Sequence, residues 1–206
     1  MDERRTDKAH FRRSILDAAR VLLHRGGYAG LSMRNIARSI GYSATSIYLY
    51  FENKEALFNA LIDEGMALLY EDLGAAWQAA AGDVDAQFQE LCARYIRFGL
   101  RWPEYYEIMF LLHPERNARF PKDMYRRARR NLDFMVDVLR EGRRQGVFQV
   151  DDIRVAASAI WASLHGAVSL LLAQRVDVGI PHEAFIDSIV HQQVRAVRVP
   201  SPVTTV

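Results

Sequence analysis

Cysteine is almost absent from this sequence, which contains only Cys92. A single thiol cannot form an intramolecular disulfide or a multi-thiolate metal site, so the sequence excludes both. We expect no metal and no cofactor. The first thirteen residues are charged where a secretory signal would be apolar. Together these features predict a cytoplasmic protein.

Strand patterns are also scarce. Only residues 146–150 alternate apolar and polar side chains, and a connecting loop explains that alternation equally well. Elsewhere the apolar residues recur at helical spacing. Half of the 206 residues are apolar, which is enough material for a buried core. The predicted fold class is all-α with about nine helices.

Caps and glycines set the expected helix boundaries. Ser32, Ser43 and Asn53 can each cap a helix, and Gly41 permits a tight turn. The expected helices span about 9–24, 32–40, 43–51, 53–77, 84–101, a short stretch from 103, 121–145, 152–174 and 181–197.

Residues 155–174 contain no Asp, Glu, Lys or Arg and are long enough to cross a bilayer. Polar residues such as Ser158, His165 and Gln174 dilute the run. A helix buried on both sides has the same composition. We favour a buried helix over a membrane span. One side of the helix would pack on the rest of the chain, and the other side on a second copy of the chain.

Charge is unevenly distributed along the chain. Residues 1–60 hold ten Lys or Arg against six acids, whereas the other 146 residues hold seventeen against nineteen. A basic N-terminal lobe suits a polyanionic partner, although an uneven solvated surface would give the same count.

The stretch 31–57, LSMRNIARSIGYSATSIYLYFENKEAL, has the plan of a helix-turn-helix. Two short capped helices meet at Gly41. Ile36, Ile40, Ile47 and Phe51 are expected to form a shared core, and Ala37 is small enough to allow close helix approach. The caps at the helix starts offer free N–H groups that can bind phosphate.

This stretch resembles the DNA-binding domain of TetR-type (tetracycline-repressor-like) transcriptional regulators. The matching positions are Ser32, Ile36, Ala37, Gly41, Ser43, Ile47, Tyr48, Tyr50, Phe51, Lys54, Glu55 and Leu57. The resemblance implies a homodimeric repressor that binds a palindromic DNA operator and is released by a small, largely apolar effector.

Residue roles follow partly from chemistry and partly from this resemblance. Short side chains at Ala44 and Thr45 can reach base edges, and Tyr48 could touch a base or a phosphate. Core packing is the alternative for Tyr48 and Tyr50. The predicted DNA-binding residues are Ser32, Arg34, Ser43, Ala44, Thr45, Tyr48, Tyr50 and Lys54.

Two features complicate this interface. Leu49 stands where the family often has a polar or basic side chain, so one phosphate contact is lost. Arg4, Arg5, Lys8, Arg12 and Arg13 could follow the duplex as an arm or form a solvated tail.

The resemblance also implies a sensor. We expect residues 1–55 to bind DNA, 56–199 to bind ligand and form the dimer, and 200–206 to be a tail. Ligand pockets are mostly apolar with a few polar anchors, but so are helical cores. The run Trp161 to Gly166, WASLHG, is similar to a Trp/His-Gly signature of one TetR subgroup. The predicted ligand-binding residues are Trp102, Tyr106, Met109, Phe110, His113, Tyr125, Trp161 and His165.

One short recognition helix covers only a few base pairs, so a two-fold dimer is expected. The last two helices would form a four-helix bundle with their symmetry mates. The predicted dimer interface is Ile160, Leu164, Val168, Leu171, Leu172, Phe185, Ile189 and Gln192.

The sequence leaves two other function classes to consider, an enzyme and an interaction adaptor. No nucleophile elbow, P-loop, HExxH or catalytic triad order occurs in the sequence, so we expect no enzyme. A helical interaction adaptor without DNA binding is the remaining alternative.

Overall fold

The computed structural model describes residues 3–111 and 122–199. The elements are α1 (Glu3–Gly30), α2 (Met33–Ile40), α3 (Ala44–Tyr48), α4 (Lys54–Ala79), α5 (Val84–Arg101), α6 (Pro103–Tyr106), the π-helix η1 (Glu107–Leu111), α7 (Lys122–Arg144), α8 (Ile153–Leu172) and α9 (His182–Val197). Within the described ranges, β pairing is limited to one bridge between Phe148 and Arg198. The all-α prediction is confirmed there. The expected tail, 200–206, lies outside the described residues.

Helix α1 is longer than its apolar pattern predicts. It begins at Glu3 rather than near Ala9, and it continues to Gly30 across a kink at Gly27, where φ is 59° and ψ is −168°. The added first turns are polar and carry no apolar stripe, so helical periodicity could not reveal them. The basic stretch at the N-terminus is therefore helical from residue 3 onward. Its contact with a DNA duplex stays a prediction.

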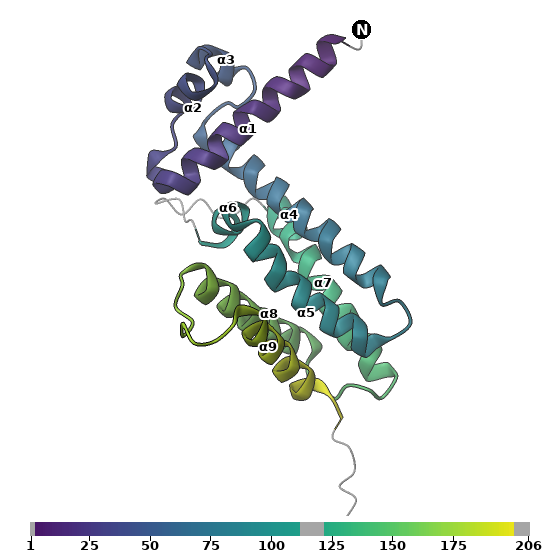
Figure 1. Cartoon of the computed structure of the whole chain (residues 1–206). Helices are drawn as coiled ribbons and strands as arrows, with labels where there is room; N and C mark the ends of the chain where they lie inside the picture. The colour runs from purple at the N-terminus through teal and green to yellow at the C-terminus, as the bar shows by residue number, and fades with distance from the viewer. Residues whose placement is uncertain (1–2, 112–121, 200–206) are drawn as a thin grey trace, which may run out of the picture. The chain divides into compact units, whose positions relative to one another are not determined.

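The chain forms two compact units. The first comprises Met1–Ala67 and Trp102–Met124, and the second Leu68–Arg101 and Tyr125–Val206. In the first unit α2 packs on both α1 and α3, as Figure 1 shows, and α1 also contacts α6 and η1. In the second unit α5, α8 and α9 pack on one another. The predicted functional boundary near residue 55 stays a prediction.

A glycine in α7 allows the chain to fold back on itself in the second unit. Val147 and Phe148 both donate their N–H groups to the Gly142 carbonyl, at 2.9 and 3.1 Å. This turn lays the Phe148 ring, 2 % exposed, directly over the Gly142 Cα, where an added Cβ would overlap ring carbons. Phe148 also packs against Phe88, with ring centroids 5.3 Å apart.

We therefore predict that Gly142→Ala lowers the free energy of unfolding by roughly 1–3 kcal/mol, because an overpacked core must shift to relieve the clash. Urea denaturation of the full chain measures this. Gly74→Ala in α4 is the matched control, since its Cβ would lie 3.7 Å from Phe134 Cζ, an ordinary contact. The control should gain about 0.5–1 kcal/mol from helix propensity. Equal effects of the two variants would contradict the packing argument.

Candidate DNA-binding interface

The helix-turn-helix is fixed locally by side-chain caps. Ser32 Oγ accepts the Asn35 N–H at 3.1 Å, and Ser43 Oγ accepts the Ser46 N–H at 3.2 Å. Between them Gly41 adopts the left-handed conformation, with φ at 74°, and ends α2. Asn53 Oδ1 accepts the Ala56 N–H at 2.8 Å and starts α4. These capping predictions are confirmed.

Burial of one side of each helix turns the other side outward. Ile36, Ile47 and Phe51 are at most 5 % exposed, so the predicted core is confirmed for these three residues, and Ala37 between the helices is 3 % exposed. Ile40 is only half-buried and lines a surface groove, so its predicted place in the core is not confirmed. Because Ile47 is fully buried, the side of α3 opposite to it faces solvent. The recognition helix is thus presented outward within its own unit.

The predicted DNA-binding residues separate into two groups by exposure. Arg34, Ser43, Thr45 and Tyr48 are exposed, and Tyr48 keeps 54 % of its surface. Ser32, Ala44, Tyr50 and Lys54 are half-buried. The first group lies on α2, on α3 and at the cap of α3. Ser43 is engaged in the capping hydrogen bonds with Ser46. Contact of either group with DNA stays a prediction.

An aromatic cluster joins α1 to the helix-turn-helix. Phe11 packs on Tyr42 with ring centroids 4.4 Å apart, and on Tyr50 at 5.1 Å. The three rings line a groove of about 680 Å³ together with Asp7, Lys8, His10, Ser14 and Ile40. The Tyr50 ring therefore packs on α1 through Phe11. Sequence reasoning did not single out Phe11 or Tyr42, because lone aromatic residues outside the apolar stripe give no periodic signal.

Lys54 lies against the end of α1. Its Nζ donates a hydrogen bond to the Tyr28 carbonyl and sits 3.8 Å from the centroid of the Tyr28 ring. Tyr28 packs in turn on Phe58 of α4, with centroids 5.0 Å apart. Lys54 thus links the start of α4 to α1 in the chain without DNA.

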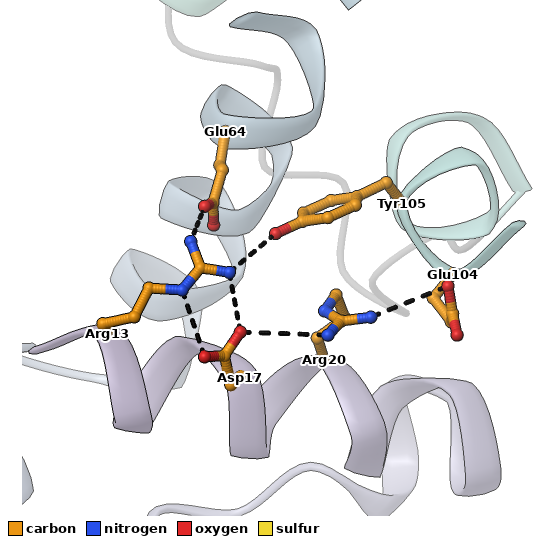
Figure 2. Close-up of polar contacts among 6 residues, drawn as sticks. All are labelled: Arg13, Asp17, Arg20, Glu64, Glu104 and Tyr105. Atoms are coloured by element: carbon orange, nitrogen blue, oxygen red, sulfur yellow. Dashed lines mark hydrogen bonds and ion pairs between the residues drawn. The ribbon is translucent and has the colours of Figure 1, made fainter. Parts of the chain in front are cut away.

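The basic residues of α1 have different environments. Lys8 is exposed, whereas Arg12 lies 5.2 Å from the centroid of the Phe51 ring. Arg13 takes part in a polar network that joins three helices (Figure 2). The three residues therefore do not form one uniform positive arm.

The polar network holds α1 to α4 and α6. Figure 2 shows the Arg13 guanidinium between Asp17 of α1, Glu64 of α4 and the hydroxyl of Tyr105 in α6. Its Nη2 lies 2.6 Å from Asp17 Oδ1 and 3.4 Å from Tyr105 Oη. The hydrogen bond with Asp17, with those to Tyr105 and Glu64, holds the pKa of Arg13 above its usual value.

The same side of α1 makes two further contacts in this unit. Arg20 lies 3.8 Å from Asp17 and 3.6 Å from Glu104 of α6. His24 Nδ1 lies 3.1 Å from Glu107 Oε2 in η1. A row of polar and charged groups at three- and four-residue spacing on α1, which are Arg13, Asp17, Arg20 and His24, therefore connects this helix to the α6–η1 segment. Periodicity could not predict the pairing of Arg20 with Glu104 or of His24 with Glu107, because the two residues of each pair are about eighty positions apart.

The predicted ligand-binding residues fall in both units. In the first unit, Tyr106 and Met109 are buried, and Trp102 and Phe110 are half-buried. In the second, Trp161 Nε1 donates to Tyr95 Oη at 2.9 Å, and its ring stacks on His165 at 5.4 Å. Burial lowers the pKa of His165. His113 and the side chain of Tyr125 lie outside the described residues.

The predicted dimer-interface residues also divide by exposure. In α8, Ile160, Leu164, Val168 and Leu171 are at most 4 % exposed, because they face the core formed with α5 and α9. Leu172, Phe185 and Ile189 are half-buried, and Gln192 is exposed. The four buried residues cannot supply the outer surface of a dimer without a rearrangement of the monomer.

Helix α8 is long and apolar enough to cross a membrane, with a mean hydropathy of 1.7, and 33 % of that window is buried in the chain. It packs on α5 and α9. Across the described ranges, no group of three His, Cys, Asp or Glu side chains could hold a metal ion.

A capped helix-turn-helix with an outward second helix, followed by a helical body, defines a helix-turn-helix regulator. Residues 15–61 match the sequence model of bacterial regulatory proteins of the tetR family. Residues 88–196, more than half of the chain, match the tetracyclin repressor-like C-terminal domain. The chain belongs to the TetR family.

Individual relatives agree with this assignment. The class D tetracycline repressor of Escherichia coli is 32 % identical over 88 residues, 41 % of this chain and 40 % of that protein. The aligned part thus spans two-fifths of the length of this curated relative.

Solved structures cover more of the chain. A protein of unknown function from Rhodococcus sp. RHA1 has a TM-score of 0.78 at 25 % identity, over 91 % of this chain and 95 % of that one. The regulator FadR of Bacillus subtilis, solved with stearoyl-CoA, has a TM-score of 0.75 at 19 % identity, over 88 % and 97 % of the two chains. At 19 % identity, the similarity to FadR shows a shared fold and nothing further.

Proposed function

We propose that the protein is a cytoplasmic, sequence-specific transcriptional repressor that binds a palindromic DNA operator as a homodimer and is released by a small, largely apolar effector. The observation that carries the proposal is the outward face of α3, where Thr45 and Tyr48 are exposed while Ile47 is buried. A helix with such a face fits the major groove. Residues 1–55 would read DNA, and 56–199 would bind the effector and form the dimer.

Exposed residues on α2 are proposed to contact phosphates, and exposed residues on α3 are proposed to contact bases. Arg34, in the first turn of α2, is exposed and suits a phosphate, which fixes position without reading sequence. Thr45 and Tyr48 on α3 suit base edges. Ser32, Ser43, Ala44, Tyr50 and Lys54 complete the proposed contact surface from half-buried and capping positions.

The dimer is proposed to form on the side of α8 and α9 that the chain leaves uncovered. On α8 this side carries Ala159, Ala162, Gly166 and Leu170, at three- and four-residue spacing. On α9 it carries Phe185, Ile189 and Gln192. Gln193 Nε2 donates to Ser163 Oγ at 2.9 Å, which holds the two helices side by side. Small side chains on α8 would let a second copy approach closely, so this copy rather than a bilayer covers the helix.

An effector is proposed to act through the α6–η1 segment. Tyr106 and Met109 there are buried, and the ion pair of Arg20 with Glu104 and the 3.1 Å contact of His24 with Glu107 join the segment to α1. A movement of α6 would therefore displace α1. Because α1 packs on α2 and α2 packs on α3, the position of α3 would change as well. The effector need favour the released state by only a few kcal/mol to shift occupancy strongly.

DNA contact is tested with duplexes selected from a random pool by the full-length protein. We predict that Tyr48→Ala weakens binding of the selected duplex about tenfold or more, because a groove contact is lost. Arg34→Ala should weaken binding to all sequences similarly and lower the salt slope by about 1. Titration at several salt concentrations measures both.

Arg140→Ala is the control for these variants, since it removes the same charge from an exposed position of α7. It should leave affinity and salt slope unchanged. If no duplex is enriched, the chain is better described as an interaction adaptor. If all three variants bind an enriched duplex alike, Arg34 and Tyr48 do not contact the DNA.

The dimer surface is tested at Gly166, where an added Cβ would meet nothing within 4 Å in the chain itself. We predict that Gly166→Arg folds normally but sediments as a 23.6 kDa monomer, whereas the unaltered protein sediments at twice that mass. Gln78→Arg, an exposed position of α4, adds the same charge and should stay dimeric. A dimeric Gly166→Arg variant would contradict the proposed surface.

A further inference from the structure

Leu49 is a large apolar side chain that the fold leaves in solvent. It is 81 % exposed, and among the large hydrophobic residues of the described ranges only Val178 is more exposed. Tyr42 and Tyr48, both more than half exposed, lie within seven residues of it in the sequence. Exposed apolar side chains that gather in one place mark a surface that contacts something.

The register of α3 places Leu49 at the centre of the outward face. Successive helical residues are rotated by about 100°, so positions four apart share a face. Thr45 and Leu49 are four apart, and both lie almost opposite the fully buried Ile47. Leu49 still has helical backbone angles, with φ at −69° and ψ at −17°, so this geometry extends to it.

The chemistry of leucine restricts what this face can bind. The side chain has no donor or acceptor, so it can hydrogen-bond neither a phosphate nor a polar base edge. In the major groove, the thymine C5-methyl group is the apolar feature of a base pair. A methyl contact removes hydrocarbon from water on both partners and is therefore favourable. Ala44, by contrast, is half-buried at the edge of this face.

We infer that Leu49 is a specificity-determining residue that reads a thymine C5-methyl group in each half of the operator. The inference rests on the proposed DNA-binding function. Thr45, one turn earlier on the same face, contacts the neighbouring base pair.

The test uses duplexes that the full-length protein selects from a random pool. Each thymine of the best duplex is replaced in turn by uracil, which keeps every hydrogen-bonding group and removes only the methyl. At one or more positions per half-site the unaltered protein should lose about fourfold in affinity, the equivalent of one buried methyl group. Leu49→Ala should bind the thymine and uracil duplexes equally at those positions.

Val21→Ala is the matched control, because it also shortens an exposed apolar side chain in the same unit. It should retain the full thymine-to-uracil difference. Leu49→Ala should keep the thermal transition of the unaltered chain, since its side chain makes little packing contact, so a loss of folding cannot imitate the result.

The inference is overturned if no position distinguishes thymine from uracil, or if Leu49→Ala shows the same difference at every position. A failure of the proposed function gives another result, in which the protein enriches no duplex at all, and the inference then fails with it. A duplex that is enriched and bound without any methyl dependence overturns only the role of Leu49.

Discussion

The functional surface depends on the packing of Ile47, which is fully buried, in the core that α3 shares with α2. Helix α3 has only five residues. A helix this short is unstable in isolation, because the cost of nucleation exceeds what a single turn of hydrogen bonds returns. The Ser43 cap and the buried Ile47 side chain therefore supply its stability, and they also set its rotation. The outward position of Thr45, Tyr48 and Leu49 follows from that one packing contact.

Charged groups perform a second task in the same unit. The first unit brings residues 1–67 together with residues 102–124. Ion pairs join α1 to α4 and α6, and the contact of His24 with Glu107 joins α1 to η1. Individual surface ion pairs contribute little stability. In the proposed function, a row of these contacts at helical spacing would transmit a displacement of the α6–η1 segment to α1. This gives the proposed effector a physical route to α3.

The sequence predicted the elements well where a local signal existed. Caps at Ser32, Ser43 and Asn53 and the turn at Gly41 depend only on neighbouring residues, and each has the expected geometry. The face of α8 was harder to predict. Because that helix is apolar almost all round, its periodicity could not distinguish the residues facing the chain's own core, such as Leu164, from those facing outward, such as Ala162. The partners of Arg13 and Arg20 on α4 and α6, which are Glu64, Tyr105 and Glu104, are distant in sequence and carried no signal.

The central claim is that two symmetry-related copies of α3 enter the major groove of one duplex. Hydroxyl-radical footprinting of the full-length protein on its selected duplex, with guanine-N7 methylation protection, tests this most directly. The account predicts two protected patches on one side of the DNA, with centres about one helical turn apart or a few base pairs further. A single patch, or protection without any effect on guanine N7, would contradict it.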